Sequence, residues 1–145
     1  MAEIATETAQ VNASLQKCLD VVTDIQRYPE WISDIKEVRI LSTDSEGRPD
    51  EVTFRAAAFG RSTNYTLKYD YSELPNKLRW VQTSGDHTNK LDGSYTFDET
   101  DSTTRITYEL EAELKIPIPG FIKRRAETLI INSALRDLKA RAESK

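Results

Sequence analysis

Tyrosines supply most of the candidate chemistry in this sequence. Five of the six alternate with polar residues in segments of period two, which predicts that their side chains share one face of a sheet: Tyr65, Tyr69, Tyr71, Tyr95 and Tyr108. Each brings an apolar ring and one hydroxyl that needs a partner. With Trp80 and Gln82 they predict an aromatic pocket with few polar anchors, which suits an apolar ligand oriented by a few hydrogen bonds. The alternative is a solid core of strand-forming residues.

Groups for proton transfer are scarcer. The only histidine, His87, falls within the segment Ser84-Gly85-Asp86-His87-Thr88-Asn89, which contains a serine, an acid and a base. A catalytic triad needs its base bonded to both partners, and neighbouring side chains on a tight turn splay apart, so we interpret the segment as a solvated hairpin turn. Arg55 and Arg79 fall on outward positions of the predicted strands. The predicted pocket is therefore short of a strong acid or base, which weakens an enzymatic interpretation.

No pattern in the sequence predicts a cofactor. No His/Cys cluster has zinc spacing, no glycine-rich loop leads from a strand into a helix, and the acidic run at Asp98, Glu99 and Asp101 lacks the EF-hand pattern. The single cysteine, Cys18, has no partner for an internal disulfide, and we interpret it as a small packed apolar group on a helix. We expect neither a metal nor a nucleotide cofactor.

Composition narrows the classes of partner and location. A formal net charge of −4 and a pI near 5.1 argue against nucleic-acid binding, which requires a broad basic surface. The length of 145 residues, with 38% hydrophobic and 30% charged residues, suits one globular domain spanning residues 1–145. Residues 1–10 lack the basic and apolar regions of a signal peptide, and no stretch approaches the ~20 apolar residues of a membrane span. We expect a cytoplasmic protein.

The first part of the chain predicts one strand and two short helices. Residues 4–11 alternate with period two, and Asn12 and Ser14 then offer N-cap oxygens to a helix whose apolar positions recur at three and four: Leu15, Cys18, Leu19, Val22 and Ile25. The segment Tyr28-Pro29-Glu30-Trp31 breaks this helix and begins another, with Pro29 in its first turn. Tyr28 and Trp31 are expected at one mouth of the pocket, where Trp31 either contacts ligand or acts as a packing plug.

The remainder predicts a meander of strands followed by one long helix. Period two continues from Lys36 to Leu114, interrupted by a turn-rich run at residues 43–50 and by Gly60. After the segment from Lys115 through Ile116 and Pro117 to Gly120, residues 121–143 lack Gly and Pro, and a helix of ~20 residues spans ~30 Å. Its apolar face is expected at Ile122, Ala126, Leu129, Ile130, Ala134, Leu135 and Leu138, with Leu129 a candidate ligand contact.

These elements predict an α+β fold. One arrangement buries every apolar face: a curved antiparallel sheet of about seven strands wraps around the long C-terminal helix, with two short helices after the first strand. This element order, the run Asp24-Ile25-Gln26-Arg27-Tyr28-Pro29-Glu30-Trp31 and the following Lys36-Glu37-Val38 resemble the START-like helix-grip (SRPBCC) superfamily, in particular its polyketide cyclase/dehydrase and coenzyme Q-binding branch. The stretch from Gly47-Arg48-Pro49 into the third strand is similar to small actinobacterial members.

The resemblance implies a cavity between sheet and helix for a lipid, sterol, quinone or polyketide, and three functions stay open. The first is binding or transport of a hydrophobic small molecule, the second is a polyketide cyclase or dehydratase that uses pocket tyrosines, and the third is a partner-binding module. The run Phe121-Ile122-Lys123-Arg124-Arg125 mixes apolar and basic residues at the expected cavity entrance. It would suit transient contact with an anionic membrane surface, or else form a solvated first helical turn.

Overall fold

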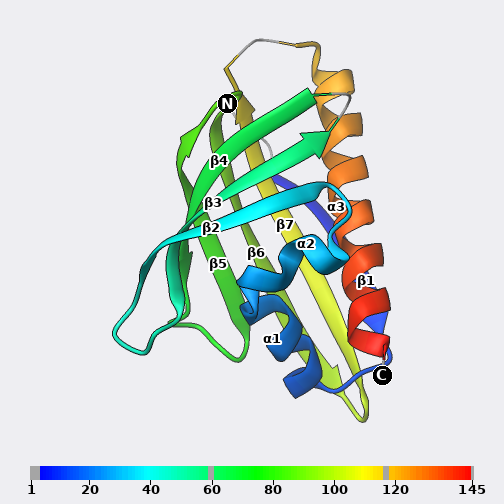
Figure 1. The fold of residues 1–145 in the computed structure, drawn as a ribbon. Coiled ribbons are helices and arrows are strands. Elements are labelled where there is room, and N and C mark those ends of the chain that lie inside the picture. Colours follow the sequence, from blue (N-terminus) through cyan, green and yellow to red (C-terminus); the bar gives the residue numbers. More distant parts are fainter. Residues whose placement is uncertain (1–3, 59–60, 116–117, 145) are drawn as a thin grey trace.

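Seven antiparallel strands form one curved sheet in the computed structural model, which describes residues 4–58, 61–115 and 118–144 (Figure 1). The strands are β1 (Ile4–Val11), β2 (Ile35–Thr43), β3 (Pro49–Ala58), β4 (Arg61–Asp70), β5 (Lys77–Gly85), β6 (Thr88–Thr100) and β7 (Thr103–Leu114). The helices are α1 (Leu15–Thr23), a 3-10 turn (Ile25–Arg27), α2 (Tyr28–Trp31) and α3 (Gly120–Glu143). The predicted order of elements is confirmed, while Gly60, Ile116 and Pro117 lie outside the described residues.

The strand order is β1-β7-β6-β5-β4-β3-β2, so every neighbouring pair except β1 and β7 is consecutive in the chain. Ile4 lies opposite Glu111 and Val11 opposite Thr104, which places the first strand beside the last. The β2–β3 pair at the other edge contains several register shifts, between Ile35 and Thr43. The result is an open, strongly bent sheet with two edges.

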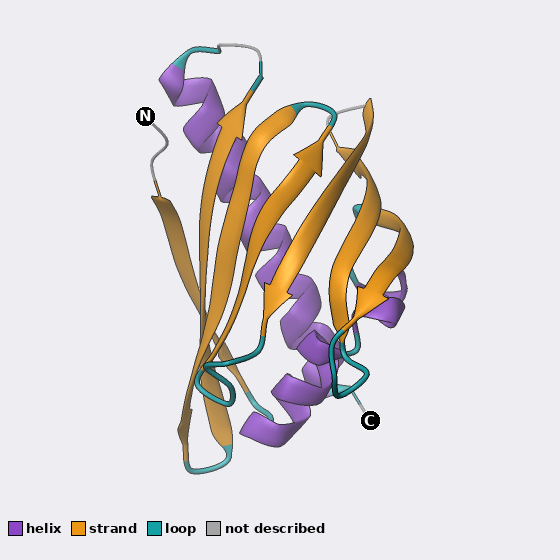
Figure 2. Ribbon diagram, turned by 90° about the vertical axis from the view of Figure 1, so that its left-hand side faces the viewer, coloured by secondary structure: helices purple, strands orange, loops and turns teal. Residues whose placement is uncertain are grey.

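The helix α3 runs along one face of the sheet and lies nearest to β1 and β7 (Figure 2). Helix α1 begins at its predicted N-cap, where the Ser14 hydroxyl accepts a hydrogen bond from the Lys17 amide at 3.2 Å. Pro29 stands in the first turn of α2, as predicted. Helices α1 and α2 lie together at one end of the sheet, on the same side as α3 (Figure 1). The concave face is therefore covered by helices at that end.

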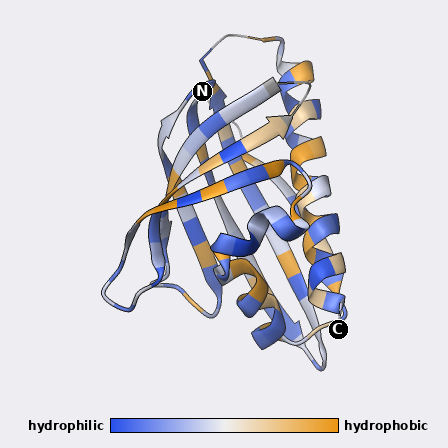
Figure 3. Cartoon of the chain, viewed as in Figure 1, coloured by the Kyte–Doolittle hydropathy of each residue, from blue (hydrophilic) through white to orange (hydrophobic). Residues whose placement is uncertain are grey.

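Alternation along the strands decides which side chains are buried. On β7, Thr104, Ile106, Tyr108, Leu110 and Ala112 are buried, and the residues between them are half-buried or exposed. The same period is visible as alternating colour along several strands in Figure 3. Cys18 is fully buried on α1, as the helical spacing predicted. The core therefore lies between the concave face and the helices.

The predicted apolar face of α3 is partly wrong. Ile131, Leu135, Leu138 and Ala142 are buried, but Ile122 is 46% and Leu129 is 55% exposed. Leu129, Ile130 and Ile131 are consecutive apolar residues on a helix of 3.6 residues per turn, so spacing alone does not decide which of them faces the sheet. Glu127 is 4% exposed, and its carboxylate accepts a hydrogen bond from the Lys123 ammonium at 2.9 Å.

None of the helices in the described ranges combines the length and the apolar character needed to cross a membrane.

Candidate functional site

A cavity of about 610 Å³ lies between the concave face and α3. The strands β2 through β7 and the helices α2 and α3 contribute to its wall or rim, together with residues of the connecting turns. The wall includes the exposed residues His87 and Ile118, so the cavity reaches the surface on that side. Its size falls within the range of small-molecule sites, about 300–1,000 Å³.

Aromatic rings make up the deep wall of the cavity. Trp80 of β5 meets Tyr95 with 5.2 Å between ring centroids, and Tyr108 edge-on at 5.7 Å. Tyr95 and Tyr108, which are cross-strand partners on β6 and β7, lie 4.9 Å apart in a T-shaped contact. Such edge-to-face contacts hold rings in fixed orientations. The wall is therefore a rigid apolar surface.

Gly93 makes room for this arrangement. It lies opposite Trp80 in the β5–β6 pair, and a Cβ atom on Gly93 would fall 2.6 Å from Cζ2 of the indole. That distance is shorter than any normal carbon contact, so only glycine lets the indole come this close to the neighbouring strand. This role of Gly93 was not predicted from the sequence.

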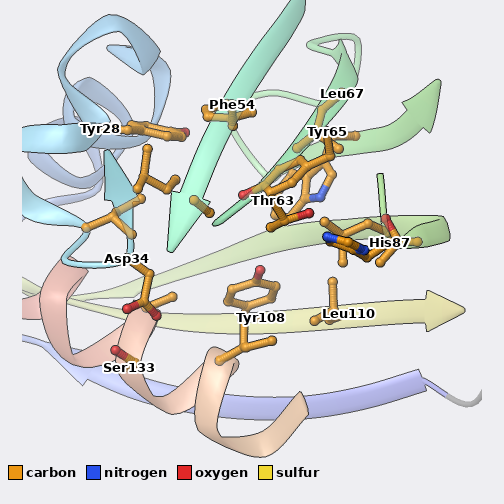
Figure 4. Close-up of a pocket in the computed structure, with 18 of the residues that line it drawn as sticks. Tyr28, Asp34, Phe54, Thr63, Tyr65, Leu67, His87, Tyr108, Leu110 and Ser133 are labelled. Atoms are coloured by element: carbon orange, nitrogen blue, oxygen red, sulfur yellow. The ribbon is translucent and has the colours of Figure 1, made fainter. Parts of the chain in front are cut away.

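The tyrosines of the wall stay protonated. Burial raises the pKa of the Tyr65, Tyr69, Tyr95 and Tyr108 phenols above the ordinary value, and the negative charge of Asp34 raises that of Tyr65 further. The Tyr108 hydroxyl points into the cavity in Figure 4. Among the described residues, none forms a hydrogen bond with the hydroxyl of Tyr65, Tyr95 or Tyr108, and no buried side-chain polar atom there lacks a partner, so these hydroxyls remain accessible. They are hydrogen-bond donors for an acceptor inside the cavity.

One end of the cavity carries a carboxylate. Asp34 lies in the turn between α2 and β2, and its backbone carbonyl accepts a hydrogen bond from the Ala57 amide at 2.8 Å. The preceding residue, Ser33, donates from its amide and its hydroxyl to Asp137 of α3, at 3.1 and 3.0 Å. These bonds fasten the turn to both β3 and α3. The position of Asp34 at the rim is therefore fixed by its neighbours, and Ser133 of α3 lies on the same side (Figure 4).

His87 and Thr63 lie on the other side of the cavity from Asp34 (Figure 4). His87 is exposed in the turn between β5 and β6, as predicted, but it also contributes to the rim. Asp86 does not pair with it in a triad, because its carboxylate accepts hydrogen bonds from the Asn64 amide and side chain at 2.9 and 3.0 Å. Those bonds lower the pKa of Asp86. The serine–acid–base run therefore does not form a catalytic triad.

Five of the nine candidate contacts line the cavity: Tyr65, Tyr69, Trp80, Tyr95 and Tyr108. The other four do not, and two of these have polar groups engaged elsewhere. Tyr71 donates from its hydroxyl to the Pro49 carbonyl at 2.5 Å, and the Arg48 guanidinium lies 4.5 Å from its ring centroid. The Gln82 side chain donates to the Thr88 carbonyl at 2.7 Å and accepts from the Thr88 hydroxyl, which ties β5 to β6.

Trp31 and Leu129 also lie outside the lining. Trp31 packs edge-on against Tyr28, with centroids 5.2 Å apart, and Tyr28 itself forms part of the wall. Leu129 points away from the cavity because its neighbour Ile130 occupies the inward position of α3. Trp31 therefore packs behind the wall, and Leu129 contributes to the outer surface.

Sequence reasoning missed the polar groups of the rim. Asp34, Thr63 and Ser133 were not singled out, and His87 was assigned only to a turn. Thr63 continues the inward alternation of Tyr65 and Leu67, so period two was a usable signal for it. Asp34 and His87 lie in turns, where no period applies. No group of three or more His, Cys, Asp or Glu residues suited to a metal ion occurs within the described ranges.

Comparison with known proteins decides the family. Residues 11–139 match the family model described as polyketide cyclase / dehydrase and lipid transport. The chain belongs to this family. Its members' helix-grip fold, within the START-like superfamily, is the one described above. No curated protein matches the sequence significantly.

Solved structures share the family fold. A START superfamily protein from Mycobacterium smegmatis superposes with a TM-score of 0.92 at 24% identity, over 97% of both chains. The Zhui aromatase/cyclase from Streptomyces superposes with a TM-score of 0.84 at 13% sequence identity, over 99% of this chain and 94% of the other. A protein from Thermus thermophilus superposes with a TM-score of 0.76 at 18% sequence identity, over 97% of both chains. At such identities these likenesses establish the fold alone.

Proposed function

We propose that this protein binds or carries a hydrophobic small molecule, of the lipid, quinone or polyketide kind, in the cavity between the sheet and α3. The observation that supports this most is the cavity itself: about 610 Å³, walled by aromatic rings in mutual contact and by aliphatic side chains. Burying an apolar ligand against such a wall gains ~25 cal/mol per Å² of apolar surface removed from water. The accessible tyrosine hydroxyls orient a ligand that carries an acceptor.

Filling the cavity tests the proposal. Ala134 lies on the cavity side of α3, so Ala134→Phe places a ring in the ligand volume, whereas Ala140→Phe adds the same ring to an exposed position of the same helix. We expect Nile red, a neutral fluorescent probe, to bind the natural protein and Ala140→Phe equally and Ala134→Phe at least ~10-fold more weakly. Native mass spectrometry of protein purified without detergent gives the natural ligand's mass. Absence of Nile red binding to the natural protein would overturn the proposal.

Ligand exchange at an anionic membrane surface is part of the proposal. Phe121 is 69% and Ile122 is 46% exposed, and Ile118, which lines the cavity, is 37% exposed. The basic residues 123–125 follow these apolar side chains directly. We expect the natural protein to sediment with vesicles containing phosphatidylserine and not with neutral ones, and Phe121→Ser with Ile122→Ser to abolish this. Equal recovery with both vesicle types would contradict membrane contact of this kind.

A second candidate is a polyketide cyclase or dehydratase, which the Asp34 carboxylate and the His87 imidazole at the rim favour. In such a reaction a base removes a proton from the carbon between two carbonyls, and a tyrosine hydroxyl stabilises the enolate oxygen. The enolate carbon bonds to a second carbonyl carbon of the same chain, whose oxygen takes up a proton and later leaves as water. The ring closure needs no oxidant or reductant.

A linear 1,3,5,7-tetraketone tests this chemistry, because the carbon between its first two carbonyls can close a six-membered ring on the fourth carbonyl, and loss of water then gives a phenol with a new ultraviolet absorbance. Catalysis would require a rate above the buffer rate that falls in His87→Ala and in Tyr108→Phe. A rate equal to buffer, or full activity after Tyr65→Phe, Tyr69→Phe, Tyr95→Phe and Tyr108→Phe together, would exclude tyrosine-assisted catalysis.

A further inference from the structure

Asp34 brings a carboxylate to the cavity that is not engaged by another side chain in the described part of the chain. It is the single carboxylate among the cavity-lining residues of the described ranges, and the neighbouring lining residues on its side are Ile32, Ile35 and Ser133. Within those ranges no group donates a hydrogen bond to its carboxylate or forms an ion pair with it. The nearest lysine in sequence, Lys36, donates instead to the Ser33 carbonyl at 2.7 Å.

The neighbouring acid shows the contrast. Asp137 also faces the turn, but its carboxylate accepts two hydrogen bonds from Ser33 and lies 3.7 Å from the Arg136 guanidinium. Asp137 is therefore used to hold the turn against α3. The turn is fixed by its bonds to Asp137 and Ala57 without any contribution from the Asp34 side chain. The hydrogen bonds that hold the turn therefore do not involve the Asp34 carboxylate.

The charge of Asp34 acts inside the cavity. It lies close enough to Tyr65 to disfavour the phenolate form there and so raises the pKa of that tyrosine. In Figure 4 the Asp34 carboxylate and the Ser133 hydroxyl lie at one side of the space enclosed by Tyr65 and Tyr108. A ligand that fills this space removes water from the carboxylate, which is costly unless the ligand replaces the lost hydrogen bond.

We propose that Asp34 is a specificity-determining residue that selects ligands bearing a hydrogen-bond donor, a hydroxyl or an amine, at the end that reaches the turn between α2 and β2. This inference rests on the proposed ligand-binding function. It also implies discrimination against ligands that bring an anion to that end, because a second carboxylate would face Asp34 with no cation between them. The ligand class is therefore an apolar, ring-containing or long-chain molecule with a neutral or cationic donor.

Three pyrenes of matched shape test the selection: 1-hydroxypyrene with a donor, 1-methoxypyrene without one, and pyrene-1-carboxylate with an anion. Each is titrated against the natural protein by displacement of Nile red at pH 7. We expect 1-hydroxypyrene to bind about 10-fold more tightly than 1-methoxypyrene, and the carboxylate to bind most weakly. Equal affinity for the first two would overturn the inference while leaving ligand binding established.

The variant Asp34→Asn removes the charge and keeps the shape. We expect the preference for hydroxyl over methoxy to fall to about 2-fold and the affinity for pyrene-1-carboxylate to rise, with Nile red binding unchanged. Glu113→Gln makes the same change of charge at an exposed position of β7 outside the cavity and should leave all three affinities as they are. An unchanged preference for 1-hydroxypyrene over 1-methoxypyrene in Asp34→Asn would contradict the role of Asp34. If the natural protein binds none of the probes, the proposed function itself is overturned.

Discussion

The indole ring of Trp80 lies against the backbone of Gly93, its partner on the neighbouring strand, at a distance that leaves no room for a Cβ atom. A methyl group on Gly93 would fall 2.6 Å from the indole and 2.8 Å from the Glu109 carbonyl oxygen, so the indole that contacts Tyr95 and Tyr108, or the neighbouring backbone, would have to shift. The aromatic wall therefore depends on one residue that has no side chain.

Gly93→Ala is expected to destabilise the protein by about 1–3 kcal/mol, as overpacking of a dense core does, and to weaken Nile red binding. Urea unfolding followed by circular dichroism measures the first effect. Gly120→Ala is the control, since its added Cβ would meet only the flexible Arg124 side chain, at 3.3 Å. Unchanged stability and probe binding in Gly93→Ala would mean that the indole can relocate freely.

Two tyrosines of the same cavity should differ in how much stability the protein loses when the hydroxyl is removed. The Tyr28 hydroxyl donates to the Val22 carbonyl in the last turn of α1, so Tyr28→Phe should cost about 1–2 kcal/mol of unfolding free energy. The Tyr108 hydroxyl faces the cavity, and Tyr108→Phe should leave the unfolding free energy within about 0.5 kcal/mol of the natural value. Chemical denaturation of both variants distinguishes the roles, and equal losses would contradict them.

Alkaline pH should unfold the protein before its tyrosines ionise in the folded state. Burial raises the pKa of all six tyrosines, in the case of Tyr71 to about 12. Tyrosines in the unfolded chain have a pKa of about 10. Above that pH the unfolded state releases protons that the folded state retains, so the free energy of unfolding falls as the pH rises. Each proton that the folded state retains lowers the free energy of unfolding by about 1.4 kcal/mol for every further pH unit.

Tyrosinate absorbance and far-ultraviolet circular dichroism, recorded in one titration, check this expectation. The two signals should change together above pH ~10. Tyrosinate that forms at lower pH while the dichroism stays native would show that one of these phenols is open to solvent.

Lys123 should matter to stability because of the carboxylate it neutralises. Glu127 is buried and its partner Lys123 is largely buried, so Lys123→Met leaves the Glu127 carboxylate as an unpaired charge. The free energy of unfolding should fall by about 2–3 kcal/mol, less than for a fully buried pair because Lys123 is partly exposed. The double variant Lys123→Met with Glu127→Met should recover most of this loss. Arg105→Met, which breaks an exposed pair with Asp98, should cost under about 0.5 kcal/mol. Equal losses of unfolding free energy in Lys123→Met and Arg105→Met would show that the burial of Glu127 is unimportant.

Regular periods explain what the sequence could predict. Tyr65, Leu67 and Tyr69 alternate along β4 and all face inward, so the sheet, its concave face and five cavity-lining residues followed from period two. The position of α3 followed from length and composition. Leu129 was misplaced because three apolar residues in a row fit two helical faces equally well.

The polar rim could not be predicted in the same way. Asp34 reaches the cavity because Ser33 binds Asp137, more than a hundred positions along the chain, and no local pattern records such a contact. His87 lies in a hairpin turn, where neighbouring side chains point in different directions and only the three-dimensional course of β5 and β6 decides which one meets the cavity. Tyr71 was predicted to face inward and is buried, but the bond to Pro49 holds it at the far end of the strand face.

The pairing of β1 with β7 has a consequence for the order of folding. Ile4 leaves the ribosome well before Glu111, its partner across the sheet, and Glu111 is synthesised just before the helix that packs on both strands. Contacts so distant in sequence carry a large cost of loop closure and slow the rate-limiting step. The meander from β2 to β6 can form by local hairpins during translation, while β1 stays unpaired until β7 emerges. A nascent chain halted before residue 103 thus has no partner strand for β1 and no α3 to close the cavity.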